Sequence, residues 1–141
     1  YLLATTNGFN EENMFTYLAL QPGTSRFKYK DSSRGSGTIN FIESFLDLGD
    51  YESKEHSLKP RILFFSGNTK IMCDKHVRPK KVNINGQLQT VLPLNRKEEL
   101  DLDPEKEYLQ QLPSAFPGTL IAVKLYLNSE HLSQKLAQVS K

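Results

Sequence analysis

Sulfur is scarce in this chain of 141 residues, which contains a single cysteine, Cys73. One cysteine excludes an intrachain disulfide, and no N-x-[ST] glycosylation sequon occurs. Both observations favour a reducing compartment, the cytoplasm or the nucleus. No apolar run approaches the roughly 20 residues that are needed to span a bilayer, so we expect no membrane-spanning segment.

The motifs of common catalytic and nucleotide sites are also missing. The sequence contains no G-x-S-x-G elbow, no Walker lysine loop and no G-x-G-x-x-G loop. A zinc site needs three or four converging ligands, but Cys73 and His76 have no second pair at metal-ligand spacing. We therefore expect no metal, no cofactor and no enzymatic activity.

The composition nevertheless provides enough apolar material for a core. Hydrophobic residues make up 38% of the chain, and eight Phe and six Tyr are present although Trp is absent. Disordered chains lack such aromatic groups, and the length matches one domain. We expect a single domain over residues 1–141. Because the chain starts at Tyr1 and not at Met, we also expect it to be a trimmed piece of a longer protein.

Strand patterns dominate the middle of the chain. Residues 62–65 are four consecutive apolar side chains, which is typical of an interior strand, and a Ser66-Gly67-Asn68 turn follows them. Alternating or short apolar patterns predict strands at residues 1–6, 26–30, 61–65, 69–73, 81–84 and 119–127, together with a hairpin partner for residues 81–84.

The sequence Asn85-Gly86 predicts that hairpin. A two-residue turn would pair Ile84 with Gln87 and would mix apolar and polar side chains on one face. A three-residue loop would pair Ile84 with Leu88, which separates the two kinds of side chain. Because a slip of one residue moves every side chain to the other face, we favour the longer loop.

Capping residues ahead of helical periodicity predict four helices. For the first of them, a strand through Phe15 and Ala19 is the alternative. The predicted helices run from Asn10 to Gln21, from Thr38 to Gly49, over residues 105–112 behind an Asp103-Pro104 start, and from Asn128 or Ser129 onward.

Runs of strands, and not alternation of strands and helices, predict an α+β fold. We expect a mainly antiparallel sheet of about five or six strands with three or four helices. The alternative is an all-β sandwich or barrel with small helices.

Basic residues are concentrated in the central third of the chain. Eight basic and three acidic side chains lie between residues 51 and 95, although the net charge of the whole chain is only +2. Clustered cations are what a polyanion site requires. The candidate contacts to an anion or a nucleic acid are Lys70, Lys75, His76, Arg78, Lys80 and Lys81.

Three functions are compatible with these patterns. We favour a non-enzymatic interaction or assembly module that binds a protein partner or self-associates, which predicts an exposed apolar patch or an unpaired sheet edge. The alternative is a nucleic-acid-binding module that uses the basic loop 70–81. A second alternative is a small hydrolase or transferase, which would need His56 or His76 in a pocket beside an acid and a nucleophile.

Overall fold

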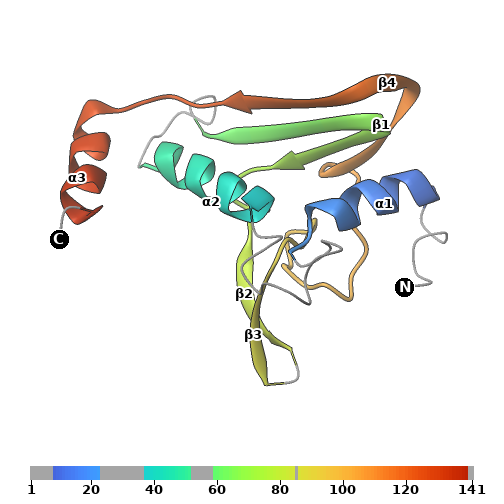
Figure 1. The fold of residues 1–141 in the computed structure, drawn as a ribbon, viewed down its shortest axis with the longest axis horizontal. Coiled ribbons are helices and arrows are strands. Elements are labelled where there is room, and N and C mark those ends of the chain that lie inside the picture. Colours follow the sequence, from blue (N-terminus) through green and yellow to red (C-terminus); the bar gives the residue numbers. More distant parts are fainter. Residues whose placement is uncertain (1–7, 23–36, 52–58, 85, 140–141) are drawn as a thin grey trace.

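The computed structural model describes residues 8–22, 37–51, 59–84 and 86–139. These residues form three helices and four strands, and the strands pair in two antiparallel sheets of two strands each (Figure 1). The α+β class is confirmed, and the all-β alternative is wrong. The expected single sheet of five or six strands is also wrong for the described residues. The strands predicted at residues 1–6 and 26–30 lie outside them.

The three helices begin close to their predicted starts. α1 spans Glu11–Leu20, α2 spans Gly37–Gly49 and α3 spans Ser129–Val139. Asn10 caps α1 in a reciprocal capping box with Asn13, and the side chain of Asn128 accepts the His131 backbone N–H at 3.0 Å. Among the described residues, no helix has the length and apolar character to cross a membrane.

β1 (Arg61–Cys73) runs out and then folds back on itself (Figure 1). A straight strand of 13 residues would extend about 40 Å, yet residues from both ends of β1 line one pocket. The reversal lies at Gly67, whose φ is +52° and where the ladder register is irregular. Two predicted strands and their turn therefore form one continuous, bent strand.

β4 (Leu109–Lys124) follows β1 through this bend. Its first residues pair with the returning part of β1, with Leu109 opposite Ile71, and its last residues pair with the outgoing part, with Lys124 opposite Arg61. The outgoing part thus has β4 along one side. The final stretch of β4, residues 119–124, forms the outer row of the sheet (Figure 1).

The helix predicted over residues 105–112 is therefore wrong. The Asp103-Pro104 start produces a single turn, in which the N–H groups of Tyr108 and Leu109 both donate to the Glu105 carbonyl at 2.9 and 3.0 Å. Tyr108 and Leu109 are fully buried, and Leu109 pairs with β1. Tertiary burial and strand pairing outweigh a local helix signal here.

β2 (Lys80–Ile84) and β3 (Gln87–Val91) form a hairpin that projects away from the rest of the molecule (Figure 1). Ile84 pairs with Gln87, so the two-residue turn is correct and the predicted three-residue loop is wrong. The argument for the longer loop required one buried face. The hairpin provides none near its tip, where Leu88 is 70% exposed, so separating apolar from polar side chains has little energetic value there.

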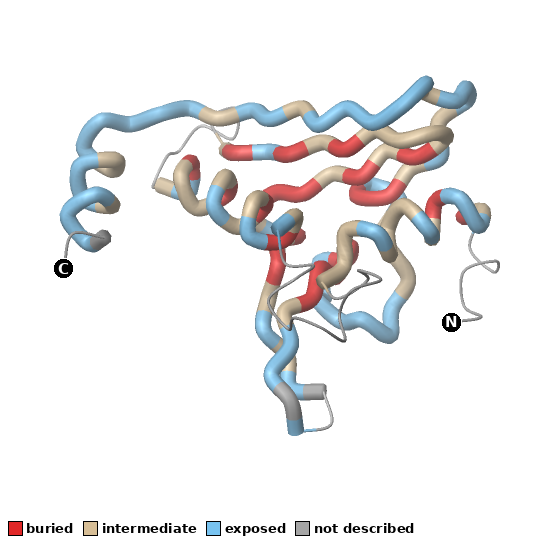
Figure 2. Tube along the Cα trace, viewed as in Figure 1, coloured by how far each residue is buried: buried red, intermediate tan, exposed pale blue. Residues whose placement is uncertain are grey.

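The core lies between the sheet and the helices α1 and α2 (Figure 2). The inward face of α2 buries Ile39, Ile42 and Leu46, as its helical spacing predicts. Ile62 and Phe64 on the outgoing part of β1 and Ile71 on its returning part are buried as well. The buried positions change from even to odd numbers across Gly67 because the bend inserts an irregular residue.

The first turn of α1 holds the bend of β1 in place. Glu12 accepts the backbone N–H of Asn68 at 3.0 Å, and the Asn13 side chain donates to the Thr69 hydroxyl at 2.8 Å and to the Asn68 carbonyl at 3.4 Å. Asn13 and Thr69 are both fully buried. Because an unsatisfied buried amide costs about 1–3 kcal/mol, these hydrogen bonds fix where α1 docks.

We predict that Gly67→Ala lowers the free energy of unfolding by about 2 kcal/mol. A left-handed backbone costs a residue with a Cβ about 1 kcal/mol, and the added Cβ would overlap the Glu12 carboxylate and displace it from Asn68, which removes about 1 kcal/mol more. Urea unfolding followed by circular dichroism measures the loss.

Gly86→Ala is the matched control. Gly86 also has a positive φ, of +81°, but a Cβ added there has nothing within 4 Å. This variant should lose only the backbone contribution, about 1 kcal/mol. Equal losses in the two variants would show that the Glu12 contact does not stabilise the bend.

Candidate functional site

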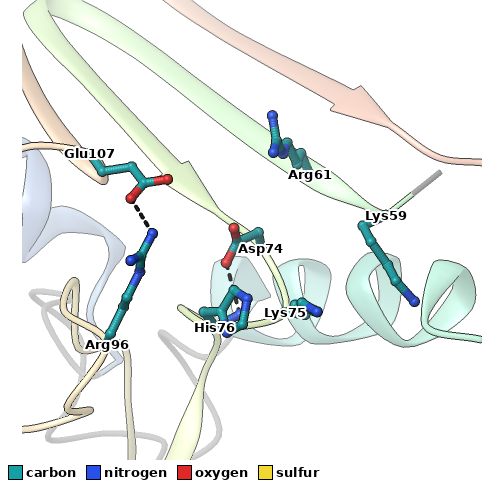
Figure 3. A pocket seen from close by; sticks show the side chains of 7 residues that line it. All are labelled: Lys59, Arg61, Asp74, Lys75, His76, Arg96 and Glu107. Carbon is teal, nitrogen blue, oxygen red and sulfur yellow. Dashed lines mark hydrogen bonds and ion pairs between the residues drawn. The ribbon is translucent and has the colours of Figure 1, made fainter. Parts of the chain in front are cut away.

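A shallow basic pocket lies where the two ends of β1 come together (Figure 3). It has a volume of about 150 Å³. Arg61 is the first residue of β1, Lys59 lies two residues before it, and Asp74 directly follows the end of β1. The lining residues are four cations, two carboxylates and one histidine: Lys59, Arg61, Lys75, Arg96, Asp74, Glu107 and His76.

Both carboxylates of the basic pocket already have partners. Asp74 is nearly buried and accepts the backbone N–H groups of His76 and Val77 at 2.8 and 3.1 Å, which fixes the loop after β1. Glu107 forms an ion pair with Arg96 at 2.5 Å, as the dashed line in Figure 3 marks. Glu107 therefore neutralises Arg96, whereas the carboxylate of Asp74 is already used by backbone N–H groups.

Three cations of the basic pocket, Lys59, Arg61 and Lys75, form no ion pair with a carboxylate among the described residues. Lys59 donates to the Tyr51 carbonyl at 2.9 Å. Arg61 lies directly opposite Lys124 in the β1–β4 ladder, so two positive side chains share one face of the sheet. Like charges in this position repel each other and destabilise a sheet.

The structure distributes the six predicted anion contacts over four places. Lys75 and His76 line the basic pocket. Lys70 donates to the Gln110 side chain on the neighbouring strand at 3.1 Å. Arg78 forms ion pairs with Asp47 and Asp50 at the end of α2.

The last two predicted contacts lie on the β2–β3 hairpin. Lys80 forms an ion pair with Glu98 at 3.3 Å, and Lys81 is exposed. Two of the six candidates, Arg78 and Lys80, are therefore already neutralised by carboxylates of the same chain. Lys59, Arg61 and Arg96 were not among the candidates because they lie 15 or more residues away from His76 in the sequence, and the fold brings them into one pocket. The bend of β1 accounts for the approach of Lys59 and Arg61.

Cys73 and His76 occupy different environments. Cys73 is fully buried in the core, and its burial, with a smaller effect of Asp74, raises the pKa of the thiol well above its usual value. The backbone of His76 lies in the loop after β1 and its side chain is exposed. Among the described residues, no group of three or more His, Cys, Asp or Glu side chains is arranged to hold a metal ion.

The outer row of β4 is the second notable surface. We call residues 119–124 the β4 edge. No described strand pairs with its outer side, and Figure 2 shows this row as exposed along most of its length. Leu120, Ile121 and Val123 are 44%, 47% and 45% exposed. Long, exposed apolar edges are rare in isolated proteins because they invite pairing with another chain.

The sequence predicted a strand at the β4 edge but not its outer position. The apolar run at residues 119–127 resembles an interior strand, since Lys124 is its single charged residue. Whether a strand lies inside a sheet or at its edge depends on its pairing with segments that are distant in the sequence. In the structure, the exposure of its apolar side chains identifies residues 119–124 as an edge.

We predict that the protein loses stability as the pH rises above about 9. Burial raises the pKa of Tyr17 from 10.0 to about 12, and it raises the pKa of the Cys73 thiol well above its usual value. Both groups remain neutral in the folded chain at a pH at which they ionise in the unfolded chain. Their stabilising contribution is therefore complete below pH 9 and is lost at higher pH.

Urea unfolding at pH 7.0, 9.0 and 10.5 measures this loss. Tyr17→Phe should flatten the decline between pH 9.0 and 10.5, because Tyr17 then no longer contributes to it. Tyr126→Phe, at an exposed tyrosine, is the control and should follow the parent protein. A decline in Tyr17→Phe as steep as in the parent would contradict the role assigned to Tyr17.

Comparisons with protein-family models, with curated proteins and with solved structures give no match for this chain.

Proposed function

We propose that this chain is a non-enzymatic protein-interaction module that binds an extended segment of a partner protein along the β4 edge. The partner segment would add a strand to the sheet, with main-chain hydrogen bonds to the outer side of β4. The observation that carries this proposal is the combination of an open strand edge and three exposed large apolar side chains on it, Leu120, Ile121 and Val123.

The absence of the usual protection supports this proposal. Natural edge strands are commonly blunted by charged side chains, by proline or by a covering element. Residues 119–124 contain no proline, and Lys124 is their one charge. Among the described residues, no strand or helix covers the outer side of this row. An edge of this composition is favourable for strand addition and costly to leave exposed to water.

A nucleic-acid-binding function has weaker support. Arg78 and Lys80, two of the cations it would use, form ion pairs with Asp47, Asp50 and Glu98. Phosphate contacts would have to break these pairs, and breaking them reduces the gain from charge neutralisation. The interaction module requires no such rearrangement.

A hydrolase or transferase has weaker support as well. His76 lies in the basic pocket beside Asp74, but the lining side chains include no serine, threonine or cysteine that could act as a nucleophile. Asp74 accepts the backbone N–H of His76, and no bond joins its carboxylate to the imidazole ring among the described contacts. His56 lies outside the described residues.

We predict that the folded protein selects strand-forming peptides from a phage-displayed library of random 12-residue peptides. The selected peptides should shift the backbone amide resonances of residues 119–124 in NMR spectra. Ile121→Lys should weaken their binding about tenfold or more, because a lysine at an open strand edge opposes strand addition.

Leu136→Lys is the matched control for this experiment. Leu136 is a 67% exposed leucine on α3, away from the β4 edge, and the same type of substitution there should leave peptide binding unchanged. Thermal unfolding confirms that both variants are folded. Selected peptides that bind Ile121→Lys as well as they bind the parent would overturn the proposal.

A further inference from the structure

The geometry points to an acidic partner: we propose that the segment bound at the β4 edge carries a carboxylate side chain opposite Lys124. This inference rests on the proposed function and adds the chemistry of the partner. Its basis is the pair Arg61 and Lys124, which lie directly opposite each other in the ladder. Among the described residues neither is paired with a carboxylate.

The face of the sheet on which this pair lies is defined by the alternation of β1. Ile62 and Phe64 point into the core, so Arg61, Leu63 and Phe65 point to the opposite face. Side chains of directly paired residues lie on the same face of a sheet. Three cross-strand pairs therefore share this outer face: Arg61 with Lys124, Leu63 with Ala122, and Phe65 with Leu120.

An added strand would continue these three rows by one position each. Its residue beside Lys124 would stand in a row that already contains two cations, and a carboxylate there would relieve their repulsion. Its residues beside Ala122 and Leu120 would extend two apolar rows. The complementary segment therefore has an acidic residue at one end, followed by apolar residues at the second and fourth positions after it.

The basic pocket also favours a carboxylate side chain beside Lys124. Arg61 also lines the pocket, together with Lys75, which has no carboxylate partner among the described residues. Figure 3 shows Arg61 on the outgoing part of β1, with Lys75 in the loop that follows the returning part. Their positive charges add to the potential at the Lys124 end of the β4 edge and favour an anion there.

A second copy of this chain does not fit as well. Residues 109–127 contain no acidic side chain, so a β4 edge paired with its own copy brings no carboxylate to Lys124. In an antiparallel pair centred on Ala122, Lys124 would lie beside Leu120 of the other copy, because directly paired side chains share one face of the sheet. Such a dimer would leave Arg61 and Lys124 without an opposite charge.

Blocked synthetic peptides test this inference directly. One has the sequence Glu-Thr-Val-Thr-Val-Thr and another the reversed order, which covers antiparallel and parallel addition; each has a counterpart with Gln in place of Glu. We expect the better Glu peptide to bind about fivefold more tightly than its Gln counterpart at low salt, with a smaller difference at 0.5 M salt. Chemical-shift titration of the full chain measures both affinities and locates the site.

The double variant Arg61→Gln/Lys124→Gln should remove the preference for Glu, so that the Glu peptide and its Gln counterpart bind it equally well. Lys81→Gln is the matched control, since Lys81 is an exposed cation on the separate β2–β3 hairpin, and it should keep the preference. Thermal unfolding verifies that each variant is folded.

The outcomes separate the two proposals. Glu and Gln peptides that bind the β4 edge equally well would overturn the acidic partner and leave the interaction module intact. A concentration-dependent dimer in sedimentation experiments that Ile121→Lys abolishes would identify a second copy as the occupant and would overturn the acidic partner. Peptides from the library and of defined sequence that all fail to shift residues 119–124 would overturn the interaction module itself.

Discussion

The contact between the first turn of α1 and the bend of β1 determines the arrangement of the rest of the molecule. Glu12 and Asn13 hold Asn68 and Thr69 through hydrogen bonds of 2.8 to 3.4 Å, and Asn13 is completely buried. Because the bend reverses β1, its two ends meet and create the basic pocket. Since β4 follows β1 through the same bend, its final residues become the outer row. Both candidate surfaces are thus consequences of one buried polar contact.

Local signals in the sequence were sufficient to predict the elements that are stabilised by contacts between residues close in the sequence. Asn10 and Asn128 identified two helix starts through side-chain caps, and helical periodicity behind Thr38 identified α2. The strand at residues 62–65 was also correct. These features depend on contacts within a few residues, which a pattern of residue types records directly.

The remaining features depend on contacts between distant residues. The Asp103-Pro104 signal predicted a helix over residues 105–112, but only a single turn forms there, because Leu109 pairs with Ile71. The basic cluster was visible in the sequence, whereas the ion pair between Arg78 and Asp47 was not, so the sequence overestimated how many cations are available. Lys59 and Arg61 could be predicted as pocket residues only if the bend of β1 were known. A pattern of residue types carries no record of which segments meet.

The register between β1 and β4 also has a consequence for how the chain reaches this structure. Ile71 pairs with Leu109, 38 positions away, whereas Arg61 pairs with Lys124, 63 positions away. Closing a shorter loop loses less chain entropy, so pairing should start at Ile71 and Leu109, pass through the bend and end at Arg61 and Lys124. During synthesis on the ribosome, residues 119–124 emerge after the rest of the β1–β4 ladder and are the last of it to pair. A partner present at that stage would meet this row just as it joins the sheet, so assembly and the completion of folding could occur as one step.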